Sequence, residues 1–114
     1  MLEINISRDY TDSPGGRYIE EGEYSGEDFR DKLLYPKYLE AQRLHEKVHI
    51  NFDGCYGYGT SFLEEAFGGL VREYKVHDFL KSIELTSTED ETIPDLIRKY
   101  VSDAEKKLIV SNDL

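Results

Sequence analysis

A glycine-rich turn between an alternating segment and a helical segment constrains this chain more than any other feature. In residues 47–53 every second residue is apolar, which predicts a strand with one buried face. The turn Gly54–Gly59 follows, and apolar residues then recur at helical spacing over residues 62–74. The residues on the buried face of the strand are Val48, Ile50 and Phe52. A strand that leads through a tight turn into a helix is typical of α/β proteins.

Three other segments have the pattern of strands. Residues 2–7 and 82–87 alternate apolar and polar side chains, which predicts one strand in each. The turn formers Pro14, Gly15 and Gly16 come before residues 17–19, which we interpret as a short strand that returns beside the first.

Two other segments have the pattern of helices. Ser25 can cap a helix over residues 25–44, and Pro36 should kink this helix or divide it. A last helix is expected from residue 92 onward. The order β-β-α-β-α-β-α predicts an α/β fold in which helices pack on a mixed sheet, with residues 47–53 as a central strand.

Composition excludes several classes of protein. The chain has 24 acidic and 14 basic residues among 114, so its net charge is −10, which argues against binding to nucleic acid or to anionic membranes. No apolar run is long enough to cross a bilayer, and the N-terminal segment has no signal-peptide pattern. The single cysteine, Cys55, cannot form an internal disulfide or a zinc cluster. We therefore expect one cytoplasmic domain over residues 1–114, without cofactor or metal.

The glycine-rich turn resembles a phosphate-binding loop in its spacing. Gly54 and Gly59 stand in the required positions, but Thr60 occupies the place of the lysine that neutralises phosphates. The ionisable side chains nearby are acidic, namely Asp53, Glu64 and Glu65. One alternative is therefore a small nucleotide- or phosphate-binding protein, or a weak enzyme, that uses residues 54–61.

The start of the next helix offers hydroxyl groups. Ser61 is predicted to be the N-cap, with Glu64 completing a capping box. A second interpretation makes Ser61 a regulatory hydroxyl as well, since a kinase can reach a serine on an exposed turn. Tyr56 and Tyr58 on the turn are typical of contact surfaces, although inward packing is equally compatible with the sequence.

Other side chains have simpler interpretations. Cys55 is a possible nucleophile, but no histidine lies near it in sequence, and the three histidines are too scattered for a metal motif. Arg17 is expected to pair with an acidic side chain. The pair Gly68 and Gly69 predicts close approach of another backbone on the buried side of the helix, either that of the sheet or that of another helix.

Several segments together resemble the STAS-like family of unknown function (DUF4325). The resemblance covers about residues 3–104, and its most specific part is residues 60–70. The segments that carry it are Ser13-Pro14-Gly15-Gly16-Arg17-Tyr18, Glu21-Gly22, Ser25-Gly26-Glu27-Asp28-Phe29-Arg30, Asn51-Phe52-Asp53-Gly54 and Thr60-Ser61-Phe62-Leu63-Glu64-Glu65-Ala66-Phe67-Gly68-Gly69-Leu70.

STAS domains are similar to anti-sigma-factor antagonists, which bind a histidine-kinase-like ATPase that can phosphorylate them. In those antagonists the phosphorylated residue is the second serine of an Asp-Ser-Ser run. The resemblance therefore implies that Ser61 takes the phosphoacceptor position with Thr60 as its neighbour, whereas Gly59 replaces the aspartate.

The resemblance implies a regulatory protein-interaction module and no enzyme, with a histidine-kinase-like ATPase as the partner. The residues expected to contact the partner or an anion are Gly54, Tyr56, Gly57, Tyr58, Gly59 and Glu64. A subunit of a homo-oligomer is a further alternative.

Overall fold

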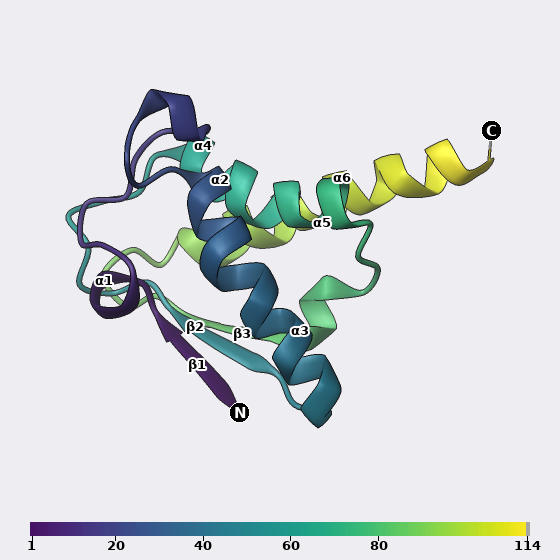
Figure 1. The fold of residues 1–114 in the computed structure, drawn as a ribbon, viewed down its shortest axis with the longest axis horizontal. Coiled ribbons are helices and arrows are strands. Elements are labelled where there is room, and N and C mark those ends of the chain that lie inside the picture. The colour runs from purple at the N-terminus through teal and green to yellow at the C-terminus, as the bar shows by residue number, and fades with distance from the viewer. Residues whose placement is uncertain (114) are drawn as a thin grey trace.

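The computed structural model describes residues 1–113, which form a three-stranded sheet and a layer of helices (Figure 1). The elements in chain order are β1 (Leu2–Asn5), α1 (Ile6–Asp9), η1 (Ile19–Glu21), α2 (Gly26–Phe29), η2 (Arg30–Leu34), α3 (Tyr35–Leu44), β2 (Val48–Asn51), α4 (Thr60–Leu63), η3 (Glu64–Gly68), α5 (Gly69–Tyr74), η4 (Phe79–Ser82), β3 (Ile83–Thr86) and α6 (Ile93–Asp113). Elements η1 and η4 are 3-10 turns, whereas η2 and η3 are π-helical turns.

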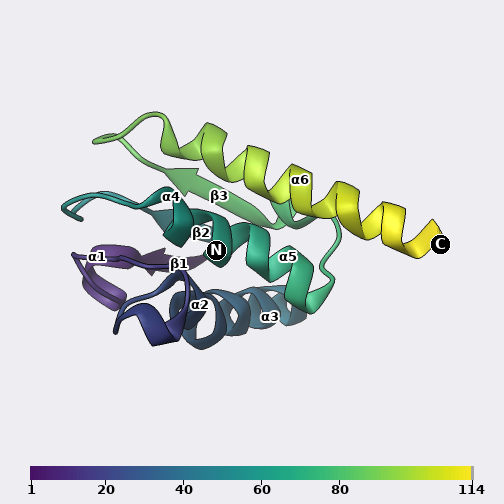
Figure 2. The ribbon, with the colours of Figure 1, turned by 90° about the horizontal axis from the view of Figure 1, so that it is seen from above.

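The sheet is parallel and its strands lie in chain order, β1-β2-β3. Ile4 pairs with Ile50, and Ile50 pairs with Leu85. Strand β2 is central, as the sequence predicts for residues 47–53. Right-handed crossovers between parallel strands in chain order place the connecting helices on one face. Figures 1 and 2 show this arrangement, with α3, α5 and α6 side by side in one layer above the sheet.

The core lies between the sheet and this helical layer. Val48, Ile50 and Phe52 are buried there, which confirms the predicted buried face of the central strand. The opposite face of the sheet is polar. On it, His49 forms hydrogen bonds through both ring nitrogens, with Nδ1 at 2.5 Å from the Glu3 carboxylate and Nε2 at 2.6 Å from the Thr86 hydroxyl. Helices among the described residues therefore cover only one face of the sheet.

The predicted strand at residues 17–19 is wrong, and so is the mixed sheet. Residues 17 and 18 are irregular and Ile19 begins the turn η1. The first strand ends at Asn5, whose side chain accepts from the backbone N–H of Arg8 at 3.1 Å and starts α1. A strand followed at once by a helical turn cannot form a hairpin, so the next strand is reached by a crossover and is parallel.

The helix predicted over residues 25–44 runs without a break through α2, η2 and α3. Ser25 caps it, accepting from the backbone N–H of Asp28 at 3.1 Å, as predicted. The π-helical turn η2 lies just before Pro36, and the residues at both of its ends, Phe29 and Tyr35, keep right-handed helical backbone angles. The predicted split of the helix at Pro36 is therefore wrong, because the wider π-helical turn accommodates the residue that lacks an N–H. Helix α6 continues to Asp113. Among the described helices, none has the length and apolar character needed to cross a membrane.

Candidate functional site

The loop that follows the central strand β2 lies where α/β proteins place their sites, at the carboxyl end of the strands. Gly54 adopts a φ of +97°, which a residue with a side chain rarely adopts. Its N–H donates to the Glu89 side chain at 2.7 Å, and Tyr56 N–H donates to the carbonyl of Asp12 at 2.9 Å. The loop is therefore fixed to two neighbouring segments of the chain.

The two tyrosines of the loop have opposite roles. Tyr56 is 89% exposed, whereas Tyr58 is half-buried and its hydroxyl donates to the carbonyl of Phe52 at 2.7 Å. The Tyr58 ring packs against the rings of Phe52 and Phe62. Tyr56 is therefore free to contact another molecule, and Tyr58 holds the loop against the core.

Helix α4 begins at Thr60, two residues earlier than the predicted Ser61 cap would require. Gly59 is the N-cap residue and its carbonyl accepts from the N–H of Leu63 at 3.2 Å. Ser61 is the second residue of the helix, so the predicted Ser61 N-cap and its capping box with Glu64 are wrong. The glycine itself supplies the extended N-cap conformation, so no hydroxyl is needed to end the loop.

Thr60 and Ser61 are both exposed at this helix start. Within the described residues neither hydroxyl has a hydrogen-bond partner. Residues three and four positions apart share a helix face, so Glu64 lies over the same surface as both hydroxyls. The structure therefore presents two unengaged hydroxyl groups beside a carboxylate.

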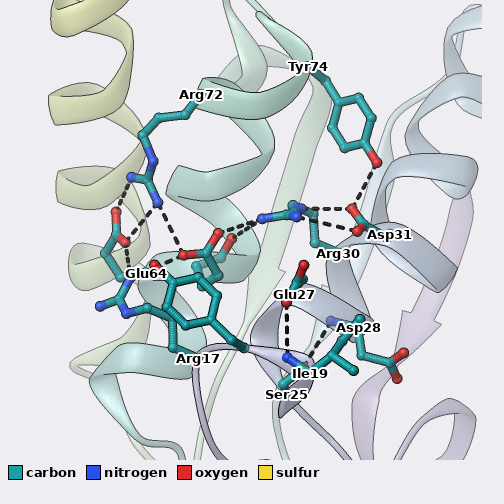
Figure 3. Close-up of polar contacts among 12 residues, drawn as sticks. Arg17, Ile19, Ser25, Glu27, Asp28, Arg30, Asp31, Glu64, Arg72 and Tyr74 are labelled. Atoms are coloured by element: carbon teal, nitrogen blue, oxygen red, sulfur yellow. Dashed lines mark hydrogen bonds and ion pairs between the residues drawn. The ribbon is translucent and has the colours of Figure 1, made fainter. Parts of the chain in front are cut away.

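Glu64 belongs to an ion network that joins the loop before α2 to the helices (Figure 3). Its carboxylate accepts from Arg17 at 2.6 Å and from Arg72 at 2.5 Å. The pairing that the sequence predicts for Arg17 is therefore found. Burial alone would raise the pKa of Glu64, but the hydrogen bonds from Arg72 and Arg17 outweigh burial and lower the pKa of this carboxyl.

The buried centre of this network is the neighbouring residue, Glu65. Its carboxylate pairs with Arg30 at 2.5 Å, and Arg17 and Arg72 lie at 3.3 and 3.5 Å. Arg30 also pairs with Asp31, which accepts from the hydroxyl of Tyr74 at 2.8 Å. These ion pairs join Arg17, η2, η3 and α5 to one another.

Glycine allows α2 and α5 to approach their neighbours closely. A Cβ atom on Gly26 would collide with the backbone carbonyl of Phe62 in α4. Gly68 and Gly69 are buried, as predicted for close approach, but the sheet is not what they meet. A Cβ on Gly68 would lie 3.2 Å from the Tyr100 carbonyl in α6, and one on Gly69 would lie 2.8 Å from Arg30. Of the two predicted neighbours, another helix is therefore confirmed, and it is α6.

A hollow of about 330 Å³ lies beside the loop at the ends of β2 and β3. The charged side chains that line it are all acidic, and no lysine or arginine lines it. The lining residues are Phe52, Asp53, Cys55, Tyr56, Gly57, Tyr58, Ser87, Glu89, Asp90 and Ile93. A phosphate in this hollow would meet carboxylates and no cation.

Asp53 and Cys55 contribute structure to this hollow. The carboxylate of Asp53 accepts from the N–H of Glu89 at 3.0 Å and from the hydroxyl and N–H of Thr88 at 2.6 and 2.9 Å, and these contacts lower its pKa. Burial raises the pKa of the Cys55 thiol, which disfavours the nucleophilic thiolate. Among the residues that the structure describes, no three His, Cys, Asp or Glu side chains are arranged to hold a metal ion.

Comparison with known families identifies the chain. The model of the STAS-like domain of unknown function (DUF4325) matches residues 25–93, which is more than half of the sequence. The chain therefore belongs to this STAS-like family. Neither the curated proteins nor the solved structures gave a match.

Sequence reasoning missed the roles of Arg30, Glu65 and Arg72. Arg72 lies eight residues beyond Glu64, twice the spacing at which side chains on a helix usually pair, so its pairing with Glu64 could not be read from the sequence. The contact between Arg30 and Glu65 joins positions 35 residues apart. No local pattern predicts such a contact.

Proposed function

We propose that this protein is a regulatory interaction module that docks to a histidine-kinase-like ATPase through the Gly54–Gly59 loop and the start of α4. The observation that carries the proposal is the pair of exposed, unengaged hydroxyls of Thr60 and Ser61 at the helix start that follows the central strand and the Gly54–Gly59 loop. In the resembling antagonists the phosphoacceptor stands at this place. Ser61 is therefore the proposed phosphoacceptor, and Thr60 is its neighbour.

The surroundings of these hydroxyls suit a docking surface. Tyr56 is almost fully exposed on a loop that backbone hydrogen bonds hold in place. An exposed aromatic side chain on a rigid loop loses little conformational entropy when a partner covers it. Tyrosine is also among the residues that contribute most to interface affinity. Tyr56 is the proposed anchor of the contact.

The start of α4 also tolerates a phosphoryl group. The N-terminal end of a helix has free N–H groups and a partial positive charge, so negative charge there is stabilising. The nearby Glu64 carboxylate is already neutralised by Arg17 and Arg72. A phosphoserine at Ser61 would therefore leave the fold intact and change only the surface that the partner meets.

The alternative function, binding of a nucleotide or phosphate at residues 54–61, has weaker support. The adjacent hollow is lined by Asp53, Glu89 and Asp90 without a basic residue. We further propose that the module has no catalytic activity of its own. This proposal is supported by Cys55, because burial raises the pKa of its thiol and so disfavours the nucleophilic thiolate.

A phosphotransfer assay tests the proposal. The chain would be incubated with ATP and a purified histidine-kinase-like ATPase that binds it, and peptide mass spectrometry would locate any phosphoryl group. We expect modification of Ser61 in the wild type and none at this position in Ser61→Ala. Modification at sites outside Thr60 and Ser61 only, or none with a partner that binds the chain, would contradict the assignment.

A further inference from the structure

The two edges of the sheet differ in how their outward backbone groups are occupied. In β1 the Leu2 N–H donates to the Lys47 carbonyl, so Glu3 and Asn5 direct their backbone groups away from the sheet. The outward N–H of Asn5 is satisfied, because it donates to the Asp9 carboxylate at 2.8 Å. Helical turn α1 also begins at the next residue. The β1 edge is therefore short and partly blocked.

The β3 edge is open. The Phe52 N–H donates to the Thr86 carbonyl at 2.9 Å, so Glu84 and Thr86 direct their backbone groups toward β2. The groups of Ile83 and Leu85 consequently point away from the sheet. In the described part of the chain they have no hydrogen-bond partner. An edge with free donors and acceptors at alternate residues can accept another strand.

A hollow of about 390 Å³ lies along this edge. Leu80, Ile83 and Leu85 line one part of it, and the charged side chains of Glu84 and of Arg98 in α6 line the rest. Ile83 and Leu85 share the helix-facing side of the sheet with Val48 and Ile50, with which they pair. An incoming strand would therefore place every second side chain below α6, against Ile83 and Leu85.

The other face of an incoming strand would meet Glu84. This side chain is 49% exposed on the open face, and its nearest cation is Lys47 at 3.9 Å. A second copy of this chain, paired symmetrically along β3, would set Glu84 against its own counterpart. Like charges directly opposite in a sheet are destabilising. A strand with a basic residue opposite Glu84 is complementary.

We propose that the β3 edge binds an extended segment of a partner protein in which apolar and basic residues alternate. The segment would add to the sheet as a fourth strand, with main-chain hydrogen bonds to Ile83 and Leu85. Apolar side chains would enter the hollow below α6, and a basic side chain would pair with Glu84. This surface is separate from the Gly54–Gly59 loop.

A nuclear magnetic resonance titration tests the proposal. The probe is a capped peptide of about six residues with alternating valine and lysine. We expect the amide signals of Ile83 and Leu85 to shift and their hydrogen exchange to slow roughly tenfold. A peptide with the same side chains but methylated at alternate backbone nitrogens is the control, and it should change neither amide.

The variant Leu85→Pro adds a second test. It removes an outward N–H without removing a bond to β2, so the fold should persist while peptide binding is lost. The proposal would be overturned if the amide signals of Ile83 and Leu85 did not shift at the highest concentration at which the peptide dissolves. It would also be overturned if both amides were already protected in the peptide-free protein and its mass in solution were that of a dimer. In that case a second copy occupies the edge.

Discussion

Arg30 and Glu65 form a buried ion pair at 2.5 Å, and each stands in one of the two π-helical turns, η2 and η3. Their side chains are only 7% and 6% exposed. Removing one partner of such a pair leaves a buried charge with incomplete compensation. The pair therefore couples the helical segments that flank the proposed docking surface.

Arg30→Leu should destabilise the protein by about 3 kcal/mol, because Glu65 keeps only the longer contacts to Arg17 and Arg72. The double variant Arg30→Leu/Glu65→Leu should recover part of that loss. Chemical denaturation measures both. Arg98→Leu is the control, because it removes an exposed pair with Asp95 and should cost less than about 1 kcal/mol. Equal losses for Arg30→Leu and Arg98→Leu would contradict the coupling role.

The ionised form of Glu64 should stabilise the fold in a pH-dependent way. Its pKa is lowered in the folded state, so this contribution is complete above the unfolded pKa of about 4.3 and is lost as pH falls through the folded pKa. Glu64→Gln should therefore be less stable than wild type at neutral pH. The difference in unfolding free energy should shrink below about pH 4. Denaturation curves over this pH range measure it, and a difference that stays constant would refute the prediction.

The close approach of α2 and α4 predicts that Gly26 accepts no side chain. Gly26→Ala places a methyl group against the Phe62 backbone carbonyl, which cannot move as a flexible side chain can. We expect a loss of about 1–3 kcal/mol in unfolding free energy. Gly57→Ala is the matched control, since its added Cβ meets nothing within 4 Å, and it should stay within about 0.5 kcal/mol of wild type. Similar melting temperatures for the two variants would be evidence against this packing.

Cys55 should react slowly with thiol reagents. Burial raises its pKa, so the thiolate fraction at neutral pH is below that of a free cysteine. The rate of alkylation by iodoacetamide, compared with that of glutathione, measures the effect. Reaction faster than glutathione would revive the interpretation of Cys55 as a nucleophile.

The sequence predicts the elements that have a strong local pattern. The central strand, the strand at residues 82–87 and the Ser25 cap were all predictable, because periodicity and capping act over a few residues. The strand expected at residues 17–19 failed for a related reason. Three residues are too few to define an alternation, and Asn5 had already ended the first strand by capping α1.

The candidate site was less predictable than the fold. The sequence located the loop and the exposed hydroxyls, but it assigned the N-cap to Ser61 although Gly59 performs that role. Both residue types are accepted at an N-cap, so the choice depends on where the preceding loop ends. The partners of Glu64 and Glu65 come from three separate segments and depend on tertiary packing.

The binding of the Ser61 variants to the histidine-kinase-like ATPase tests the central claim most directly. Ser61 is exposed and caps nothing, so Ser61→Ala and Ser61→Asp should both fold with stability within about 0.5 kcal/mol of wild type. Calorimetric titration should give equal affinity for wild type and Ser61→Ala. Ser61→Asp should bind at least roughly tenfold more weakly, a difference of about 1.4 kcal/mol, because its charge is buried at the contact. Equal affinity for all three would contradict the account, since the start of α4 would then lie outside the surface that the partner covers.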